Sequence, residues 1–179
     1  MLSATLISAC ATRPPVPEQT ASPFVIERDL VGQSVARGEF RSVTGVRRPF
    51  TARLEGTWDG ELFTLVEDFE FDDGERDRKT WRLTRTAPGR YVGSREDVVG
   101  QATGFQDGDV FRLEYDMRLP SENGRGMKVR FRDVMALNAE GQVLNNASVG
   151  WYGFRVGSVS LVITPEAAAD ASASRSAAQ

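Results

Sequence analysis

The chain contains no histidine, and this absence removes several kinds of chemistry at once. A Ser-His-Asp triad, a histidine general base and histidine metal ligands are all excluded. Cys10 is the single cysteine, so no intramolecular disulfide can form. Lysine occurs only at positions 79 and 128, and all other basic side chains are arginines. The chain is therefore poor in the bases and soft ligands that many enzymes and metal sites use.

Long hydrophobic runs and an excess of positive charge are also missing. No apolar segment approaches the roughly 20 residues that a membrane-spanning helix needs. The 22 basic and 25 acidic residues leave a formal net charge of −3, and the signs are well mixed along the chain. This distribution argues against a nucleic-acid partner, which would require a basic stripe. The length of 179 residues predicts one domain with a sizeable core.

Cys10 follows the small residues of a short apolar run, ISA, and precedes a proline-rich segment. This pattern resembles the lipobox of bacterial lipoproteins, in which the preceding segment is removed and the cysteine is acylated. Two or more acyl chains make such an anchor effectively stable. Ala11 and Thr12 follow, without the aspartate typical of lipoproteins retained in the inner membrane. The resemblance therefore implies anchoring in the outer membrane, on its periplasmic face; an ordinary buried or N-terminal thiol is the alternative.

These observations divide the chain into four parts. Residues 1–9 form a signal segment, but they contain no Lys or Arg, so we expect the true start to lie upstream. Residues 10–23 are the lipidated cysteine and its linker, and residues 24–165 are the folded domain. Residues 166–179 are rich in Ala and Ser without an apolar stripe, and we expect a disordered tail.

Apolar and polar residues alternate with a period of two through the folded domain. The clearest case is residues 111–119, which read FRLEYDMRL. Asp-Gly pairs at 59–60, 73–74 and 107–108 are strong signals for hairpin turns. The pattern predicts strands near 50–58, 62–71, 79–86, 91–98, 101–105, 111–119, 127–137, 143–149 and 158–164. Only residues 23–33, which precede all of these strands, are predicted to form a short helix.

Nine or so strands joined by short hairpins form a meander, and a long meander protects its edges by closing into a barrel. We therefore predict an all-β fold, a single up-and-down antiparallel barrel of the lipocalin or calycin kind. A barrel of about eight strands has room for side chains or one small ligand. A two-layer sandwich is the alternative, but its Greek-key crossovers need longer connections than these turns provide.

Several blocks of the domain resemble the signature of a bacterial lipoprotein family catalogued as domain of unknown function 3833. The blocks are GTWDG at 56–60, LVEDF at 65–69, DG at 73–74, WRLT at 81–84 and DVVGQATG at 97–104. The likeness extends over roughly residues 38–164. It implies a location in the cell envelope and a calycin-like barrel, and it implies no activity.

Charged residues on the apolar strand faces are the best indication of a site, because an unpaired buried charge is costly. Counting by twos places Glu67 and Asp133 on apolar faces and Arg85 on the face of Trp81. Either Arg95 with Asp97, or Glu96, also points inward. The candidate ligand-binding residues of the barrel interior are Glu67, Trp81, Arg85, Asp97, Tyr115 and Asp133. A structural ion-pair network is the plainer interpretation of the same residues.

We expect no enzyme, no catalytic residue, no cofactor and no metal. A hydrolase using two carboxylates among Glu67, Asp97 and Asp133 is the catalytic alternative. The acid-rich turn at 72–77 lacks the spacing of a calcium loop. Two functions remain open: a lipocalin-like barrel that binds a small apolar or amphipathic molecule, or an accessory envelope lipoprotein with a packed interior and an unknown protein partner.

Overall fold

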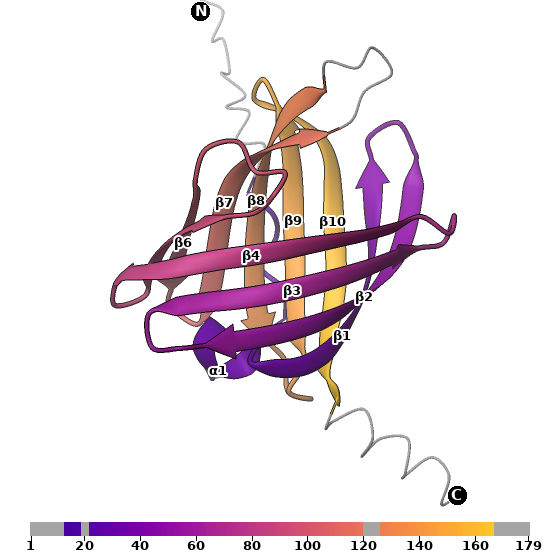
Figure 1. Ribbon diagram of the computed structural model, residues 1–179. Coiled ribbons are helices and arrows are strands. Elements are labelled where there is room, and N and C mark those ends of the chain that lie inside the picture. Colours follow the sequence, from indigo (N-terminus) through magenta and orange to yellow (C-terminus); the bar gives the residue numbers. More distant parts are fainter. Residues whose placement is uncertain (1–12, 19–21, 120–125, 167–179) are drawn as a thin grey trace, which may run out of the picture.

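The computed structural model describes residues 13–18, 22–119 and 126–166. In this part of the chain one short helix precedes ten strands (Figure 1). The helix is α1 (Ile26–Asp29), and the strands are β1 (Gly32–Ser42), β2 (Arg47–Trp58), β3 (Leu62–Phe71), β4 (Arg76–Ala87), β5 (Arg90–Ser94), β6 (Ala102–Asp107), β7 (Val110–Leu119), β8 (Met127–Leu137), β9 (Val143–Trp151) and β10 (Phe154–Pro165). Cys10, the expected signal segment and residues 167–179 of the expected tail lie outside the described residues.

The strands form one closed antiparallel barrel. Each strand pairs with its neighbours in the sequence, and β1 pairs with β10 to complete the ring. The closing pair runs from Ser34 opposite Pro165 to Ser42 opposite Gly157. Side chains alternate between the two faces of a strand, so every second residue points into the barrel. The predicted all-β, up-and-down barrel is confirmed.

The start of the domain differs from the prediction. The predicted helix at 23–33 is wrong in length, since α1 has four residues and β1 already begins at Gly32. Gly32 has a φ of +94°, which a glycine adopts without strain and which leads the chain from the helical turn into the strand. The inward residues of β1 include Ser34, Ala36 and Gly38. Such small residues make a weak hydrophobic alternation, and the sequence pattern therefore did not predict this strand.

A second difference follows β5. This strand ends at Ser94, whereas the sequence predicted a strand to residue 98. Val98 then makes an isolated bridge to Met117 of β7, and β6 begins only at residue 102. The loop between β5 and β6 contains Arg95 and Asp97.

α1 and the residues around it close one end of the barrel (Figure 1). Phe24, Ile26 and Leu30 are almost completely buried in the main core cluster. The backbone N–H of Phe24 donates a hydrogen bond to the carbonyl of Asp109 at 3.0 Å, which ties this segment to the β6–β7 turn. Phe24 also contacts the ring of Phe111 edge to face, with 6.5 Å between the centroids. These contacts form an apolar floor.

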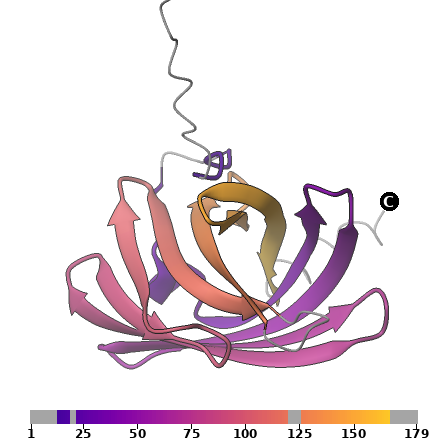
Figure 2. The same cartoon turned by 90° about the horizontal axis from the view of Figure 1, so that it is seen from above.

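Part of the expected linker belongs to the folded body. The Asn146 side chain of β9 donates a hydrogen bond to the carbonyl of Pro15 at 3.0 Å. Figure 2 shows residues 13–18 outside the barrel, beside the strands of this wall. Val134 lies opposite Asn146 and, like Asn146, points outward from the barrel. Val134 and Ala136 are nevertheless fully buried, so another segment covers this part of the outer face. The proline-rich segment therefore packs on the outer wall.

The end opposite α1 carries exposed apolar side chains on two neighbouring hairpins. The hairpins are adjacent because the N–H of Val43 donates to the carbonyl of Val156 at 3.0 Å. The exposed residues, here called the rim patch, are Val43, Val46, Trp151, Tyr152 and Phe154. No helix in the described residues is long and apolar enough to cross a bilayer.

Candidate functional site

The barrel contains a cavity of about 390 Å³. Its lining extends from Ile26, which is 1% exposed on the floor, to Val46, which is 58% exposed at the rim. The cavity therefore reaches the surface at the end opposite α1. Most of its lining is apolar, and its charged side chains are Arg48, Glu67, Arg95 and Asp133. The volume lies within the roughly 300–1,000 Å³ typical of ligand pockets.

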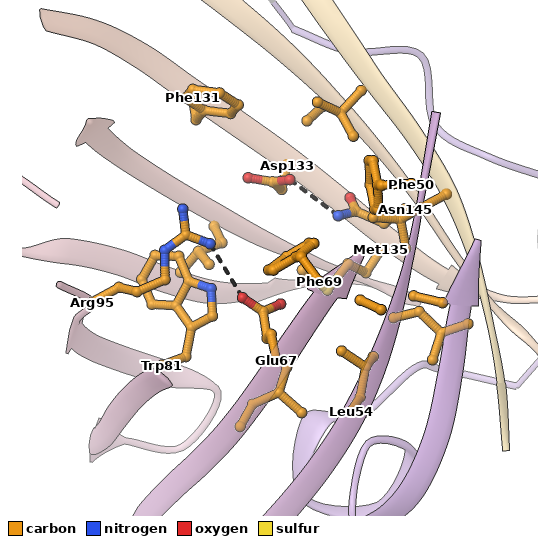
Figure 3. Close-up of a pocket in the computed structure, with 18 of the residues that line it drawn as sticks. Phe50, Leu54, Glu67, Phe69, Trp81, Arg95, Phe131, Asp133, Met135 and Asn145 are labelled. Atoms are coloured by element: carbon orange, nitrogen blue, oxygen red, sulfur yellow. Dashed lines mark hydrogen bonds and ion pairs between the residues drawn. The ribbon is translucent and has the colours of Figure 1, made fainter. Parts of the chain in front are cut away.

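Arg95 is the centre of a buried ionic cluster on one side of the cavity (Figure 3). Its Nη1 lies 3.2 Å from Glu67 Oε2 of β3, and its Nε lies 2.8 Å from Asp97 Oδ1. Its Nη2 makes two more contacts, to Asp97 Oδ2 at 3.3 Å and to Met117 Sδ at 3.0 Å. Glu67, which the sequence analysis placed on an apolar face, is largely buried, and Arg95 is its partner. Asp97 does not line the cavity, but its carboxylate forms an ion pair with the Arg95 guanidinium.

Aromatic rings surround this arginine. The Arg95 guanidinium lies 4.8 Å from the ring centroid of Trp81 and 5.7 Å from that of Tyr115. The rings of Trp81 and Tyr115 meet edge to face at 4.9 Å, and Tyr115 stacks on Phe131 at 5.2 Å. Burial raises the pKa of Tyr115 well above its ordinary value, and the negative charge of Asp133 raises it further. Tyr115 is therefore a neutral phenol at physiological pH.

Asp133 and Asn145 form a second polar pair, on the wall built by β8 and β9 (Figure 3). The Asn145 amide donates to Asp133 Oδ1 at 3.1 Å. Asp133 is 6% exposed and Asn145 is 8% exposed. Neither Asp133 Oδ2 nor Asn145 Oδ1 has a donor within hydrogen-bond distance among the described residues, although the Tyr115 hydroxyl approaches the Asp133 carboxyl and lowers its pKa. Both residues line the cavity.

Burial perturbs both cavity carboxyls. Desolvation raises the pKa of Glu67 to about 7, although the attraction of Arg95 opposes the shift. Desolvation raises the pKa of Asp133 to about 6, against the hydrogen bond from Asn145. Burial alone would lower the pKa of the Arg95 guanidinium, but its attraction to the Glu67 and Asp97 carboxylates and its hydrogen bond to Asp97 raise the pKa instead. The cluster thus has a permanent cation, and two acids that titrate near neutral pH.

Arg85 is not part of this site, and the prediction that placed it there is wrong. Its side chain is 43% exposed and lies at the floor end, where Nη1 is 3.6 Å from Glu27 of the α1 segment. Nη2 donates to the carbonyl of Gly60 at 3.0 Å. Counting by twos from Trp81 gave the correct side of β4, but residue 85 lies beyond the end of the cavity, just before a bulge.

The sequence prediction brought Glu67, Trp81, Tyr115 and Asp133 to one cavity, and the structure places all of them in its lining. It left the orientation of Arg95 open and missed Asn145. The only signal for Asn145 was an amide at an inward position of β9, two residues before Ala147. The described residues contain no group of three or more acidic or thiol side chains that could hold a metal ion.

The family of the chain follows from a comparison of its whole length. Residues 4–165 match the family model described as Protein of unknown function (DUF3833), and the match includes the entire barrel. The chain belongs to this family. The resemblance expected from the GTWDG and DVVGQATG blocks is thereby confirmed as to family. A comparison with curated protein sequences finds no match for this DUF3833 protein.

Two solved structures resemble the DUF3833 barrel. Rv2717c from M. tuberculosis has a TM-score of 0.55 and 15% sequence identity, and the match covers 77% of this chain and 93% of that one. The S-type phycobiliprotein lyase CPES from Guillardia theta has a TM-score of 0.54 and 8% identity, with 77% and 88% covered. At such low identities the likeness concerns the fold alone, which is that of a lipocalin-like barrel.

Proposed function

We propose that this DUF3833 protein is a lipid-anchored envelope protein whose barrel binds one small apolar or amphipathic molecule. The observation that carries the proposal is the cavity of about 390 Å³, which is apolar, open at the rim and closed by α1. Ligand sites have this composition, with mostly apolar walls and a few polar groups that orient the ligand. The polar groups here are Glu67 with Arg95, and Asp133 with Asn145.

Acylation of Cys10 is the proposed anchor, and the periplasmic face of the outer membrane is the proposed location. The pattern of residues around Cys10 supports this assignment. Arg13 is three residues after Cys10 and begins the segment that packs on the barrel wall. Three extended residues span about 10 Å. An acylated Cys10 would therefore hold the barrel close to the bilayer.

The proposed role is binding without catalysis, and without a cofactor or nucleic acid. The carboxyls of Glu67 and Asp97 are both engaged by Arg95, at 3.2 Å and 2.8 Å. Carboxylates held in this way are poorly placed to act as the acid and base of a hydrolase. The mixed surface charge and net charge of −3 offer no basic stripe for a nucleic acid.

The second candidate function is an accessory lipoprotein with a protein partner. The rim patch favours it, because neighbouring exposed apolar side chains often mark an interaction surface. This alternative assumed a packed interior, and the cavity argues against that assumption.

Native mass spectrometry of gently purified, full-length protein tests the binding function. We expect a bound small molecule that is lost on denaturation. Ala52→Phe, which fills the cavity from β2, should abolish the adduct, whereas Thr51→Phe on the outer face of the same strand should retain it. An adduct that survives Ala52→Phe in a folded variant would place the ligand elsewhere. A wild-type protein that neither carries a ligand nor takes up apolar probes would favour the accessory role.

The anchor is tested separately. Cys10→Ser, in a gene with a complete signal sequence, should no longer incorporate labelled palmitate and should leave the detergent phase. Unchanged palmitate incorporation in this variant would reject acylation at Cys10.

A further inference from the structure

Two buried oxygen atoms in the cavity have no donor within hydrogen-bond distance among the described residues, although the Tyr115 hydroxyl approaches the Asp133 carboxyl. These are Asp133 Oδ2 and Asn145 Oδ1, on residues that are 6% and 8% exposed. A buried acceptor without a donor costs free energy, so native structures rarely leave one unpaired. The two residues are joined by a 3.1 Å hydrogen bond and both line the cavity (Figure 3). The position therefore suits a ligand group that donates hydrogen bonds.

The arginine of the cavity is already occupied. Arg95 donates from Nε and Nη2 to Asp97, from Nη1 to Glu67, and from Nη2 to Met117 Sδ. Four of its five N–H groups are used in this way, so an anionic ligand would have to compete with two carboxylates that already pair with the guanidinium. Arg48, the other cation of the lining, is bound to Asp73 and Glu75 at the rim. Each arginine is thus already paired with two carboxylates, which compensate its positive charge.

The charge around the polar pair is also negative. Glu67 and Asp97 both pair with the guanidinium of Arg95, and Asp133 lies near enough for the charge of Arg95 to lower its pKa. Lys79 approaches Asp97 only to 3.8 Å and lies closer to Asp77, at 2.9 Å. When these acids are ionised, a second cation would balance the cluster, and an added anion would be repelled.

We infer that the cavity selects a cationic amphiphile, whose ammonium group docks on Asp133 and Asn145 while its apolar part fills the rest of the barrel. This inference rests on the proposed binding function and names the class of its ligand. An ammonium supplies N–H donors to both unpaired oxygens, and hydrogen bonds between charged partners are stronger than neutral ones. Phe131, which precedes Asp133 on the same inward face, adds an aromatic ring of the kind that attracts cations.

Titration calorimetry of the full-length protein with three probes of equal chain length tests the inference: decylamine, decan-1-ol and decanoate. We expect decylamine to bind at least about tenfold more tightly than decanoate at pH 7.5, with decan-1-ol between them. This ranking uses the unmodified protein and depends on no variant. Equal or tighter binding of decanoate would overturn the inference and leave the binding function standing. Failure of all three probes to bind would contradict the binding function itself.

Asp133→Asn removes the charge but keeps the shape. It should weaken decylamine binding about tenfold, with little change for decan-1-ol. The matched control is Asp116→Asn, which removes a carboxylate from the outer face of β7, where Arg130 and Lys128 hold it. This control should bind all three probes as the wild type does. An unchanged preference for decylamine in a folded Asp133→Asn variant would overturn the inference.

The pH dependence of binding provides a second readout. Between pH 8 and pH 5 Asp133, with its pKa of about 6, takes up a proton, so decylamine binding should weaken while the amine stays charged. The other titratable and charged groups that act on this position are Glu67 from β3, Tyr115 from β7, and Arg95 with Asp97 from the loop after β5. Asp133→Asn should reduce this pH dependence, and a full dependence in that variant would contradict the assignment to Asp133.

Discussion

At the scale of single residues, the polar side of the cavity is organised by Arg95, which pairs with two carboxylates. A buried guanidinium is tolerated only with partners, and Glu67 and Asp97 supply them at 3.2 Å and 2.8 Å. Desolvation still dominates for Glu67, whose pKa is raised to about 7 despite this contact. The ion pair is thus well formed, yet the carboxylate would be more stable in water than inside the barrel.

The raised pKa values predict an unusual dependence of stability on pH. Glu67 and Asp133 have folded-state pKa values of about 7 and about 6, above the ordinary values of 4.5 and 3.8. The folded state therefore binds more protons than the unfolded state, and the contribution to stability is complete at acidic pH and is lost as the pH rises to 7. Because the chain has no histidine, little else titrates in this range. We expect the urea midpoint to fall between pH 5 and pH 7.5.

Single amide substitutions test this assignment. Glu67→Gln and Asp133→Asn should each flatten the curve of urea midpoint against pH. Glu55→Gln, on the exposed face of β2, is the control and should leave the slope unchanged. Surface acids such as Asp68 have lowered pKa values and act at more acidic pH. A wild-type curve that is flat, or that rises with pH across this range, would contradict the raised pKa values.

At the scale of elements, the alternation along a strand determines whether a side chain points into or out of the barrel. It does not determine how far along the barrel axis that side chain lies. Tyr115 and Arg85 were both predicted to point inward. Tyr115 lies at the middle of β7 and reaches the cavity, whereas Arg85 lies near the end of β4 and reaches Glu27 near the floor. The position along the barrel follows from strand register and from where the floor lies, and neither is encoded in the period of two.

The contact between the floor and β2 predicts a steric requirement at Gly56. A Cβ atom at this position would lie 1.7 Å from the carbonyl oxygen of Leu30, which follows α1. Gly56→Ala should therefore push the floor away and lower the free energy of unfolding by about 1–3 kcal/mol. Thr57→Ala, on the outer face of the same strand, is the control in urea denaturation. Equal midpoints for the two variants would mean that the floor does not depend on this close contact.

At the scale of the whole molecule, the pairing of β1 with β10 turns a meander into a closed barrel that surrounds the cavity. Closure removes the sheet edges, where unpaired backbone groups invite aggregation. It also brings together residues that are distant in the sequence: Glu67 and Arg95 come from one side of the ring, and Asp133 and Asn145 from the other (Figure 3). The candidate site exists only because the ring is closed.

The seam between β1 and β10, which closes the barrel, requires the two strands to approach closely at Gly38. This residue lies opposite Leu161, and a Cβ atom would come within 2.5 Å of the Leu161 Cβ and 2.7 Å of the Ser160 carbonyl oxygen. Gly38→Leu should separate β1 from β10 and destabilise the barrel by at least about 1–3 kcal/mol.

The control for this seam is Arg37→Leu, which adds the same side chain on the outer face of β1. Tryptophan fluorescence and far-ultraviolet circular dichroism should report one coincident unfolding transition in both proteins, since a closed barrel unfolds as a unit. A Gly38→Leu variant as stable as Arg37→Leu would show that the seam tolerates separation.

The strand class, most turns, the up-and-down order and the inward direction of Glu67, Trp81, Tyr115 and Asp133 can all be predicted from the sequence. These properties are local, because the pleat sends alternate side chains to opposite faces and Asp-Gly pairs form tight turns. The sequence did not determine β1, whose small inward residues leave little hydrophobic contrast, or the length of α1. Three features follow from the folded arrangement: Arg95 and not Arg85 contacts Glu67, Asn145 contacts Asp133, and a cavity remains between these pairs. These features depend on strand register, on ring closure and on the packing of the floor, and all three involve residues too far apart in the chain for any local pattern to relate them.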